Sequence, residues 1–416
     1  MFKEQSILAP APQSPQSNEP LRIVPQDEDR FHRFSLISWW DQKRLSAARV
    51  LVIGAGALGN EIVKNLALLG VGNIFIADMD RIENSNLSRS ILYRASDNGQ
   101  PKSQTAARAA AEIYPEIKAH HFDGNVVYDL GLGVFRWADL VIGGLDNREA
   151  RLAINRACWK VNRPWIDGAI EQLQGVARVF IPQTDGPCYE CTMSEMDFKL
   201  LAMRRSCNLL TRSQMQGGAT PTTPTVSSII AGIQCQEAVK ILHGMESIAG
   251  RGFVFNGLTT EAYNVEYQRK ADCYSHDTLS EIIALDEGVD AITARELLKR
   301  ARTLLGDKAE LELARDVLEK LTCTACGKSQ TLFASLGKVS TAQGVCPDCG
   351  AARDVSTFFK IRGDESFLDL PLAAIGVPAF DIITARAADR SIGFEIAGDA
   401  SKVLGPLIND QQLEWA

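Results

Sequence analysis

Short apolar runs alternate with amphipathic stretches along most of the first 280 residues. Residues 48–53 form an apolar run that ends in a glycine turn, and residues 59–70 follow with apolar positions at helical spacing. Further strand-like and helical stretches follow at 73–78, 102–113, 139–143 and 164–170. Buried strands that alternate with helices predict an α/β fold with a doubly wound, mostly parallel sheet of the Rossmann-like kind.

Changes in this pattern divide the chain. Residues 1–28 are rich in Pro, Gln and Ser and are predicted to be a flexible tail. The α/β domain is expected at 29–280, interrupted by a polar, irregular insertion at 186–220, and a C-terminal region is expected at 281–416. Additional helices are expected at 34–47, 225–243 and 290–321, and two strands around a turn at 253–267. Residues 357–416 mix short apolar runs with turns and predict no particular fold.

The composition limits the function. The chain has 416 residues, 45% of them hydrophobic and 23% charged, which is typical of a soluble protein of two or three domains. Its 51 acidic residues exceed its 44 basic ones, and the net charge of −7 disfavours nucleic-acid binding. No apolar run is long enough to cross a bilayer, and the N-terminus lacks the apolar core of a signal peptide. The sequence therefore predicts a cytoplasmic protein without a membrane partner.

Three glycines directly after the first apolar run form a G-x-G-x-x-G turn, at Gly54, Gly56 and Gly59. Glycines there let the backbone approach a phosphate, and the N-terminus of the following helix favours anions. Asp78 ends the next apolar run, where a carboxylate binds the hydroxyls of an unphosphorylated ribose. These features fit NAD as well as ATP, and by themselves they slightly favour NAD.

Two segments favour ATP over NAD: DMDRIENSNLSR, which begins at this aspartate, and GQPK, which follows it. They supply Asp80, Asn86, Arg89 and Lys102. Two cations and an amide suit a triphosphate, whose charge must be neutralised before an acyl oxygen attacks its α-phosphorus. A dinucleotide site rarely needs them, so we predict an ATP site.

Asp146 and Asn147 follow the apolar run 139–143, at the sheet edge where ligands bind. An aspartate there is interpreted equally well as a turn or helix-capping residue. Beside a polyphosphate it is better interpreted as a ligand of Mg²⁺, which prefers oxygen ligands.

GAGALG, DMDRIENSNLSR, GQPK and GLDNREAR stand in the order and approximate spacing of the ThiF/MoeB/ubiquitin-activating superfamily, which residues 29–280 resemble. The resemblance implies an adenylation domain that uses ATP and Mg²⁺. The roles that it implies are ribose binding for Asp78, phosphate binding for Asn86, Arg89 and Lys102, and magnesium binding for Asp146.

The segment DRFHRF resembles the family's R-Y-x-R-Q motif, with Phe34 in place of the glutamine. The resemblance implies that Arg33 is an arginine finger, which many members insert from a partner subunit. A homodimer with two composite sites is therefore expected. The alternative is that Arg33 is an ordinary surface charge.

Six of the ten cysteines lie in C-x-x-C pairs, which in a reducing compartment more often hold zinc than form disulfides. Two of the pairs, separated by 19 residues, predict a zinc ribbon at 322–355 with Cys323, Cys326, Cys346 and Cys349 as ligands. Such a ribbon is either purely structural or a docking platform for a ubiquitin-like protein or a conjugating enzyme.

The third pair, Cys188 and Cys191, needs two further ligands. The family places a C-x-x-C pair here and closes the site with a second pair further along, where this chain has Cys273 and His276. Zinc accepts three thiolates and one imidazole, and four protein ligands make a structural site. The competing assignment joins Cys188 and Cys191 to one ribbon pair and leaves the other pair without a partner.

Cys207 lies in the irregular insertion, shortly after Arg204 and Arg205, whose charges favour a thiolate. In ubiquitin-activating enzymes the thioester-forming cysteine lies in this place and is often followed by threonine, whereas here Asn208 follows. The alternative is a free loop cysteine. The remaining two cysteines lie in apolar helical patterns and are expected to be buried and inert: Cys158 and Cys235.

The sequence therefore predicts two chemical steps. The C-terminal carboxylate of a ubiquitin-like protein is adenylated with ATP and Mg²⁺, and Cys207 then takes the acyl group as a thioester for a conjugating enzyme. Two alternatives remain, a sulfur-carrier adenylyltransferase, whose product becomes a thiocarboxylate, and a nucleotide-binding scaffold without catalysis. The presence of Arg89, Lys102 and Asp146 argues against the scaffold.

Overall fold

The computed structural model describes residues 29–182, 184–199, 221–388 and 390–408. The chain divides into two compact units, Met1–Gln42 and Lys43–Ala416. The described part of the first unit holds one 3₁₀ turn, η1 (Phe34–Leu36), and a group of aromatic rings with centroids 4.8–6.0 Å apart: Phe31, Phe34, Trp39 and Trp40. The single helix expected at 34–47 is therefore wrong, because residues 37–41 are not helical and α1 (Gln42–Ala47) begins only after them.

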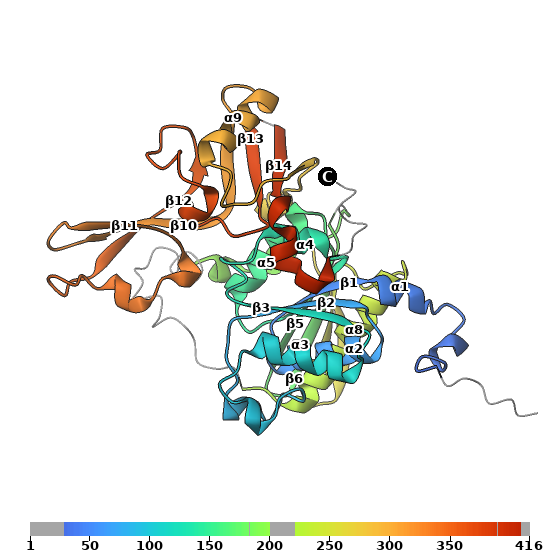
Figure 1. The fold of residues 1–416 in the computed structure, drawn as a ribbon. Coiled ribbons are helices and arrows are strands. Elements are labelled where there is room, and N and C mark those ends of the chain that lie inside the picture. The colour runs from blue at the N-terminus through green and yellow to red at the C-terminus, as the bar shows by residue number, and fades with distance from the viewer. Residues whose placement is uncertain (1–28, 183, 200–220, 389, 409–416) are drawn as a thin grey trace, which may run out of the picture. The chain divides into compact units, whose positions relative to one another are not determined.

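An eight-stranded sheet dominates the second unit (Figure 1). Its strands are β1 (Arg49–Ile53), β2 (Asn73–Asp78), β3 (Lys118–Asp123), β4 (Leu140–Gly144), β5 (Trp165–Glu171), β6 (Gln174–Phe180), β7 (Arg251–Asn256) and β8 (Glu261–Glu266). They lie in the order β3-β2-β1-β4-β5-β6-β7-β8. The first five are parallel, and the last three extend the sheet in antiparallel fashion. The predicted doubly wound, mostly parallel sheet is confirmed.

Helices cover both faces of this sheet. They are α2 (Ala57–Leu68), α3 (Lys102–Ile113), α4 (Leu132–Trp137), α5 (Arg148–Lys160) and α8 (Pro224–Leu242). Figure 1 shows α4 and α5 on one face and α2, α3 and α8 on the other. The strands between them are buried runs of branched and aromatic residues such as Phe75 and Trp165, as expected for parallel strands covered on both sides.

A second sheet forms the C-terminal region. Its elements are β9 (Ile282–Leu285), α9 (Ala294–Leu305), β10 (Glu310–Cys323), β11 (Ser329–Ser335), β12 (Arg353–Ile361), β13 (Ile382–Ala387), β14 (Arg390–Ile396) and α10 (Ala400–Leu404). The strand order is β11-β10-β13-β14-β9, and β12 also pairs with β10. The α9 helix packs against β10 and β13.

The helix expected at 290–321 is confirmed only in part. Thr293 caps α9, and Gly306, with φ of +96°, ends it. Beyond this glycine the chain enters β10, where Leu311 and Leu313 alternate with polar residues and are buried. Later in β10 the register shifts, and the apolar residues no longer alternate regularly. Without regular alternation, the sequence did not reveal a strand there.

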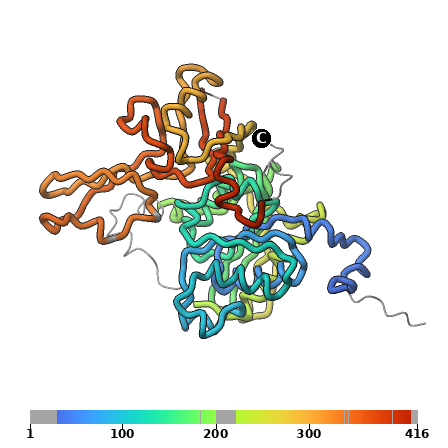
Figure 2. The backbone as a smooth tube through the Cα atoms, in the orientation of Figure 1, coloured from blue at the N-terminus to red at the C-terminus, as the bar shows by residue number. Residues whose placement is uncertain are grey.

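Short 3₁₀ turns complete the described chain: η2 (Asn84–Asn86), η3 (Ala95–Asp97), η4 (Glu190–Thr192), η5 (Tyr274–His276), η6 (Leu336–Lys338), η7 (Thr341–Gly344), η8 (Leu372–Ile375), η9 (Ala397–Asp399) and η10 (Gly405–Leu407). In Figure 2 the last described residues, in red, return to the first sheet, where η10 contacts β2 and β3. Among the described helices, none has the length and apolar character needed to cross a membrane.

Candidate nucleotide site and metal centres

The candidate nucleotide site lies at the carboxyl ends of β2, β1 and β4, where the strand order reverses. Ile53 at the end of β1 pairs with Ala77 of β2 on one side and with Gly143 of β4 on the other. The loops that follow the three strands therefore meet at one edge. Doubly wound sheets bind their ligands in the crevice at this point.

The predicted glycines shape the loop between β1 and α2. Gly54 has φ of +91°, and a Cβ there would lie 2.5 Å from the carbonyl oxygen of Gly144. A Cβ on Gly59 would lie 1.8 Å from the carbonyl oxygen of Gly54. Gly56, the N-cap of α2, is different, because a Cβ there would meet no described atom within 4 Å. The loop thus packs closely on one side and leaves open space at the helix N-terminus, which attracts anions.

Two buried side chains that the sequence analysis missed support this loop. Asn60 Nδ2 and Tyr93 Oη both donate to the carbonyl oxygen of Ala55, over 2.7 Å and 2.5 Å. Asn60 Oδ1 also accepts from the backbone N–H of Leu92 at 2.9 Å. Burial raises the pKa of Tyr93, so its hydroxyl remains a donor at neutral pH. The sequence offered a sign of the role of Asn60, because an asparagine among apolar helix positions needs hydrogen-bond partners. Nothing in the sequence marked Tyr93.

Asp78 lies at the end of β2, beside the glycine loop. Its Oδ2 accepts from the N–H of Ala55 at 2.6 Å, and its Oδ1 accepts from the N–H of Asp80 at 2.7 Å. Burial raises the pKa of Asp78, and these backbone donors and the Lys102 charge act against that rise. Lys102, the first residue of α3, forms an ion pair with Asp80 at 2.8 Å. Since a carboxylate oxygen accepts two hydrogen bonds, Asp78 retains acceptor capacity for ribose hydroxyls.

The predicted amide and second cation lie in and after η2. Asn86 Oδ1 accepts from the N–H of Glu83 at 3.0 Å, and Arg89 Nη1 donates to the carbonyl oxygen of Ser85 at 2.8 Å. Both side chains belong to half-buried residues. This contact holds Arg89 in place and uses one of the five N–H groups of its guanidinium. The other N–H groups can donate to a phosphate.

The loop after β4 assigns different roles to two neighbouring residues. Asn147 is the N-cap of α5, and its Oδ1 accepts from the N–H of Ala150 at 2.8 Å. Its Nδ2 donates to Asp146 Oδ1 at 3.3 Å. Asp146 is exposed. The capping role considered for Asp146 therefore belongs to Asn147, and this arrangement is compatible with the Asp146 carboxylate being a cation ligand.

A buried ion network, also missed by the sequence analysis, holds the loop after β4. Asp167 on β5 has no solvent exposure and accepts from Arg151 Nε and Arg178 Nε, each over 2.9 Å. Arg151 Nη2 also donates to the carbonyl oxygens of Leu145 and Gly168. Because Leu145 directly precedes Asp146, the network fixes the position of the backbone next to the candidate magnesium ligand.

Two catalytic predictions remain. Arg33 is exposed in the first unit, directly before η1, and Cys207 lies outside the described residues. The predicted burial of Cys158 and Cys235 is confirmed. Burial raises the pKa of both thiols, to about 12 for Cys235, so both stay protonated at neutral pH.

The first set of predicted metal ligands comes together. The Sγ atoms of Cys188 and Cys191 lie 3.7 Å apart, those of Cys188 and Cys273 lie 3.5 Å apart, and Cys191 Sγ lies 3.5 Å from His276 Nε2. All four candidate ligand atoms lie within 4.8 Å of one another. Zinc–sulfur bonds of about 2.3 Å in a tetrahedron place sulfur atoms about 3.8 Å apart. The four residues therefore fit zinc without either ribbon pair.

The second set also comes together, with the four atoms within 4.8 Å. Cys323 Sγ lies 3.4 Å from Cys349 Sγ, and Cys326 Sγ lies 3.8 Å from Cys346 Sγ. Gly327, with φ of +70°, donates its N–H to the carbonyl oxygen of Cys323 at 3.1 Å. This left-handed turn allows both thiols of the pair to face one point. The geometry again fits a tetrahedral zinc ion.

We expect purified protein to contain two zinc ions per chain, one for each set. His276→Ala should lower the content to about one, because three thiolates alone leave the first tetrahedron incomplete. His243→Ala, at the C-cap of α8, is the matched control and should keep both ions. Elemental analysis measures this directly. An unchanged zinc content in His276→Ala would exclude His276 as a ligand.

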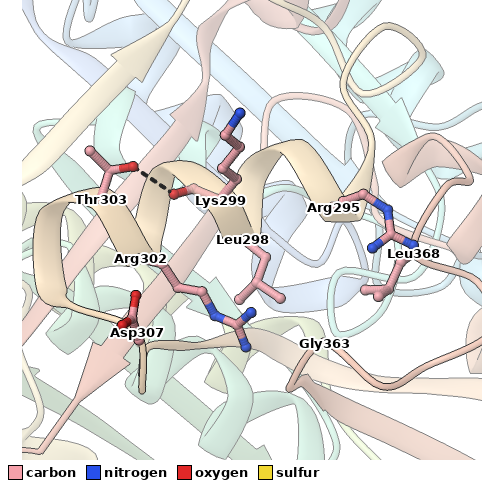
Figure 3. Close-up of a pocket in the computed structure, with 8 residues that line it drawn as sticks. All are labelled: Arg295, Leu298, Lys299, Arg302, Thr303, Asp307, Gly363 and Leu368. Atoms are coloured by element: carbon pink, nitrogen blue, oxygen red, sulfur yellow. Dashed lines mark hydrogen bonds between the residues drawn. The ribbon is translucent and has the colours of Figure 1, made fainter.

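A separate pocket of about 420 Å³ lies against α9 in the C-terminal region (Figure 3). Its lining residues are Arg295, Leu298, Lys299, Arg302, Thr303, Asp307, Gly363 and Leu368. Arg295 Nε pairs with Asp369 at 2.5 Å, and Arg302 Nη2 donates to the carbonyl oxygen of Arg362 at 2.6 Å. None of the predicted site residues lines this pocket, so it is distinct from the nucleotide site.

The fold and the sheet edge define a Rossmann-like adenylation domain, with a glycine loop, a carboxylate at the end of β2 and an acidic loop after β4. The chain belongs to the ThiF family, whose sequence profile matches residues 29–275.

Characterised relatives are similar over more than half of the chain. The sulfur carrier protein adenylyltransferase of Thermus thermophilus is 28% identical over 267 residues, which cover 61% of this chain and 92% of that protein. The SAMP-activating enzyme E1 of Haloferax volcanii is 30% identical over 239 residues, which cover 56% of this chain and 81% of that enzyme. The crystal structure of MccB from Escherichia coli superposes with a TM-score of 0.50 at 21% identity, covering 60% of this chain and 73% of that one. The last similarity concerns the fold alone.

Proposed function

We propose that this chain activates the C-terminal carboxylate of a ubiquitin-like protein by adenylation with ATP and Mg²⁺. One observation carries the proposal: the glycine loop at Gly56, the Asp78 carboxylate and the Asp146 loop meet at a single sheet edge. The names of the two relatives describe an adenylyltransferase and an activating enzyme. They support acyl adenylation over the dinucleotide chemistry that the glycine motif alone slightly favoured.

In the first proposed step, a carboxylate oxygen of the protein substrate forms a bond to the α-phosphorus of ATP. The bond from that phosphorus to the β-phosphate oxygen breaks, which gives an acyl adenylate and pyrophosphate. No protein base is needed, because the attacking carboxylate is already ionised, so catalysis rests on positioning and charge neutralisation. Asp78 would hold the ribose, and Asn86, Arg89 and Lys102 would hold the phosphates. Asp146 would hold Mg²⁺, an ion that would supply positive charge for the departing pyrophosphate.

In the second proposed step, the Cys207 thiolate attacks the acyl carbon, a carbon–sulfur bond forms, and AMP leaves. The described flanks of the segment that carries Cys207 support this role. Before it, Asp197 pairs with Arg148 of α5 at 3.2 Å. After it, the carbonyl oxygen of Pro221 accepts from the N–H of Gln172 at 2.6 Å, in the turn after β5. Both flanks thus lie at the carboxyl edge of the sheet. A conjugating enzyme then accepts the acyl group.

A homodimer is part of the proposal. Arg33 is exposed and lies in a unit separate from the sheet, which is compatible with an arginine finger that enters the site of a partner subunit. Its positive charge would stabilise the developing charge on the phosphates. Zinc in both cysteine sets has a structural role, and the ribbon at 322–355 is the proposed docking platform for a protein partner.

A sulfur-carrier adenylyltransferase is the second candidate function. The name of the Thermus thermophilus relative favours it. The first chemical step would be the same, but the acyl group would pass to a sulfur donor and end as a thiocarboxylate. A non-catalytic nucleotide-binding scaffold would perform neither step.

Pyrophosphate exchange into ATP tests the proposed function. Purified protein is incubated with ATP, Mg²⁺, labelled pyrophosphate and ubiquitin-like proteins encoded in the same genome, each with an intact C-terminus. We expect labelled ATP with at least one of them, and none with the same protein lacking its last two residues. Nucleotide binding without exchange for any such substrate would favour the scaffold and contradict the proposal.

A further inference from the structure

The chain between β3 and α4, residues 124–131, contacts the C-terminal sheet, and we call it the bridging loop. Arg315 Nη1, from β10, donates to the carbonyl oxygens of Tyr128 and Leu130, over 3.2 Å and 3.0 Å. Ser335 Oγ, from β11, donates to Asp129 Oδ1 at 2.6 Å. Two strands of the C-terminal region therefore hold the backbone and a side chain of a loop that belongs to the first sheet.

A buried ion pair completes this contact. Arg315 Nη2 lies 3.0 Å from Asp381 Oδ1, and the two side chains are only 7% and 2% exposed. The same Asp381 oxygen accepts from the N–H of Leu132, directly after the bridging loop, at 2.8 Å. A Cβ on Gly131 would lie 2.4 Å from the carbonyl oxygen of Phe380. The end of the loop thus packs against the backbone just before β13, and a buried pair such as Arg315 and Asp381 is costly to break.

The irregular register of β10 accounts for the direction of Arg315. On β10, Glu312 lies opposite Lys360 of β12, but the next paired residue, Val317, lies opposite Phe358. Arg315 falls in this interruption, where it has no ladder partner on β12. A bulge turns a side chain away from the direction that regular alternation would give it. Here it allows Arg315 to reach the bridging loop.

The bridging loop continues the contact to the nucleotide site. Tyr128 Oη donates to Glu149 Oε1 at 2.9 Å. Glu149 lies in the first turn of α5, and Asn147 is the N-cap of that helix. Asp146 directly precedes the cap. The Tyr128 hydroxyl therefore connects the C-terminal region, through Arg315 and the loop backbone, to the first turn of the helix that follows the candidate magnesium ligand.

We propose that Tyr128 is a positioning residue, through which the C-terminal region fixes the Asp146 loop and sets the affinity of the nucleotide site for Mg²⁺. The inference rests on the proposed function, because it takes Asp146 as the magnesium ligand. Arg151, held by Asp167, donates to the carbonyl oxygen of Leu145 in the Asp146 loop, and Tyr128 holds the first turn of α5 through Glu149. Metal sites depend on such supporting contacts, because these fix the orientation of the ligand before the ion arrives.

The test is the Mg²⁺ dependence of pyrophosphate exchange in two variants. Tyr128→Phe removes one hydroxyl that donates to a carboxylate, and Arg315→Lys replaces a planar fork by a point charge that cannot hold the loop carbonyls and Asp381 together. In each variant we expect the Mg²⁺ concentration for half-maximal rate to rise about three- to tenfold. The maximal rate at saturating Mg²⁺ should stay within about twofold, which a general loss of folded protein would not produce. The double variant should rise less than the product of the single effects, because both residues act on one loop.

Two conservative changes elsewhere serve as controls. Tyr263→Phe alters an exposed tyrosine on β8, and Arg295→Lys alters an exposed ion pair on α9. Neither should shift the Mg²⁺ dependence. An unchanged Mg²⁺ requirement in both Tyr128→Phe and Arg315→Lys would overturn the inference.

Amide hydrogen exchange gives a readout that does not depend on activity. Residues 147–151 should exchange faster in Tyr128→Phe and in Arg315→Lys than in the wild type, and the controls should match the wild type. Equal protection of this segment in all proteins would show that the loop does not restrain α5. If the wild type lacks pyrophosphate exchange while these residues lose protection, the proposed function fails and the structural connection stands.

Discussion

Replacing Asp146 with asparagine should lower the rate of pyrophosphate exchange at least about 100-fold, a loss of about 2.7 kcal/mol of transition-state stabilisation. The amide has nearly the same shape but no charge, so it should bind Mg²⁺ poorly while leaving the Asn147 cap of α5 intact. The assay is labelled ATP formation at several Mg²⁺ concentrations. Asp307→Asn, at an exposed position after α9, is the matched control and should retain the wild-type rate. Full activity in Asp146→Asn would remove this residue from the site.

The same variant tests the composite site of the proposed homodimer. Arg33→Ala and Asp146→Asn should each be slow by themselves. If Arg33 enters the site of the partner subunit, a mixed dimer holds one site in which both residues are intact, so mixing should restore part of the rate. A mixture that forms heterodimers and stays inactive would place Arg33 in its own site or outside catalysis.

Cys207→Ala should abolish the reductant-sensitive adduct between this chain and its ubiquitin-like substrate, while pyrophosphate exchange continues. The reason is that Cys207 lies outside the nucleotide motifs, so adenylation does not depend on it, whereas the thioester has no other proposed acceptor. Non-reducing gel electrophoresis with and without thiol reductant detects the adduct. Release of AMP in a single turnover is the cleaner measure of transfer, because a retained adenylate inhibits exchange.

Three further proteins sharpen this result. Cys207→Ser should form an oxygen ester that survives the reductant, since a hydroxyl replaces the thiol at the same position. Replacing both Arg204 and Arg205 with glutamine should slow thioester formation, with part of the rate recovered at high pH, because nearby positive charge favours the thiolate. Cys235→Ser is the control for a buried cysteine and should still form the thioester. An adduct that persists in Cys207→Ala would assign the nucleophile to another cysteine, and no adduct in the wild type would favour the sulfur-carrier alternative.

Local periodicity was enough to predict the regular elements of the first sheet. The helix at 102–113 and the strand at 73–78 have the predicted bounds, because an alanine-rich amphipathic stretch and a fully buried apolar run each fit one type of element. In β10 the local signal was misleading. Its leucines and glutamates favour a helix, but the segment pairs with β11, β12 and β13, and those long-range contacts decide its conformation.

The candidate site shows the same division between local and distant information. The sequence placed Gly54, Asp78 and Asp146 on three successive loops, and strand pairing brings these loops to one edge. It did not reveal Tyr93 or Asp167, because their partners lie on other elements and leave no spacing pattern in the chain. Only the geometry decided that Asn147, and not its neighbour, caps α5.

The first cysteine set has a consequence for how the polar insertion after Cys191 can vary in length. Cys191 and Cys273 enclose the chain that includes residues 200–220, and the pairing of β6 with β7 holds its ends within the same sheet. Once the ends of a segment are fixed, each doubling of its length adds only about 0.6 kcal/mol of closure entropy. A metal bound by this set would join these ends, and the length of the insertion would then be nearly neutral for folding. Evolution can then replace a short insertion by a long one at this position, and change the protein partner that it meets, without redesigning the nucleotide site.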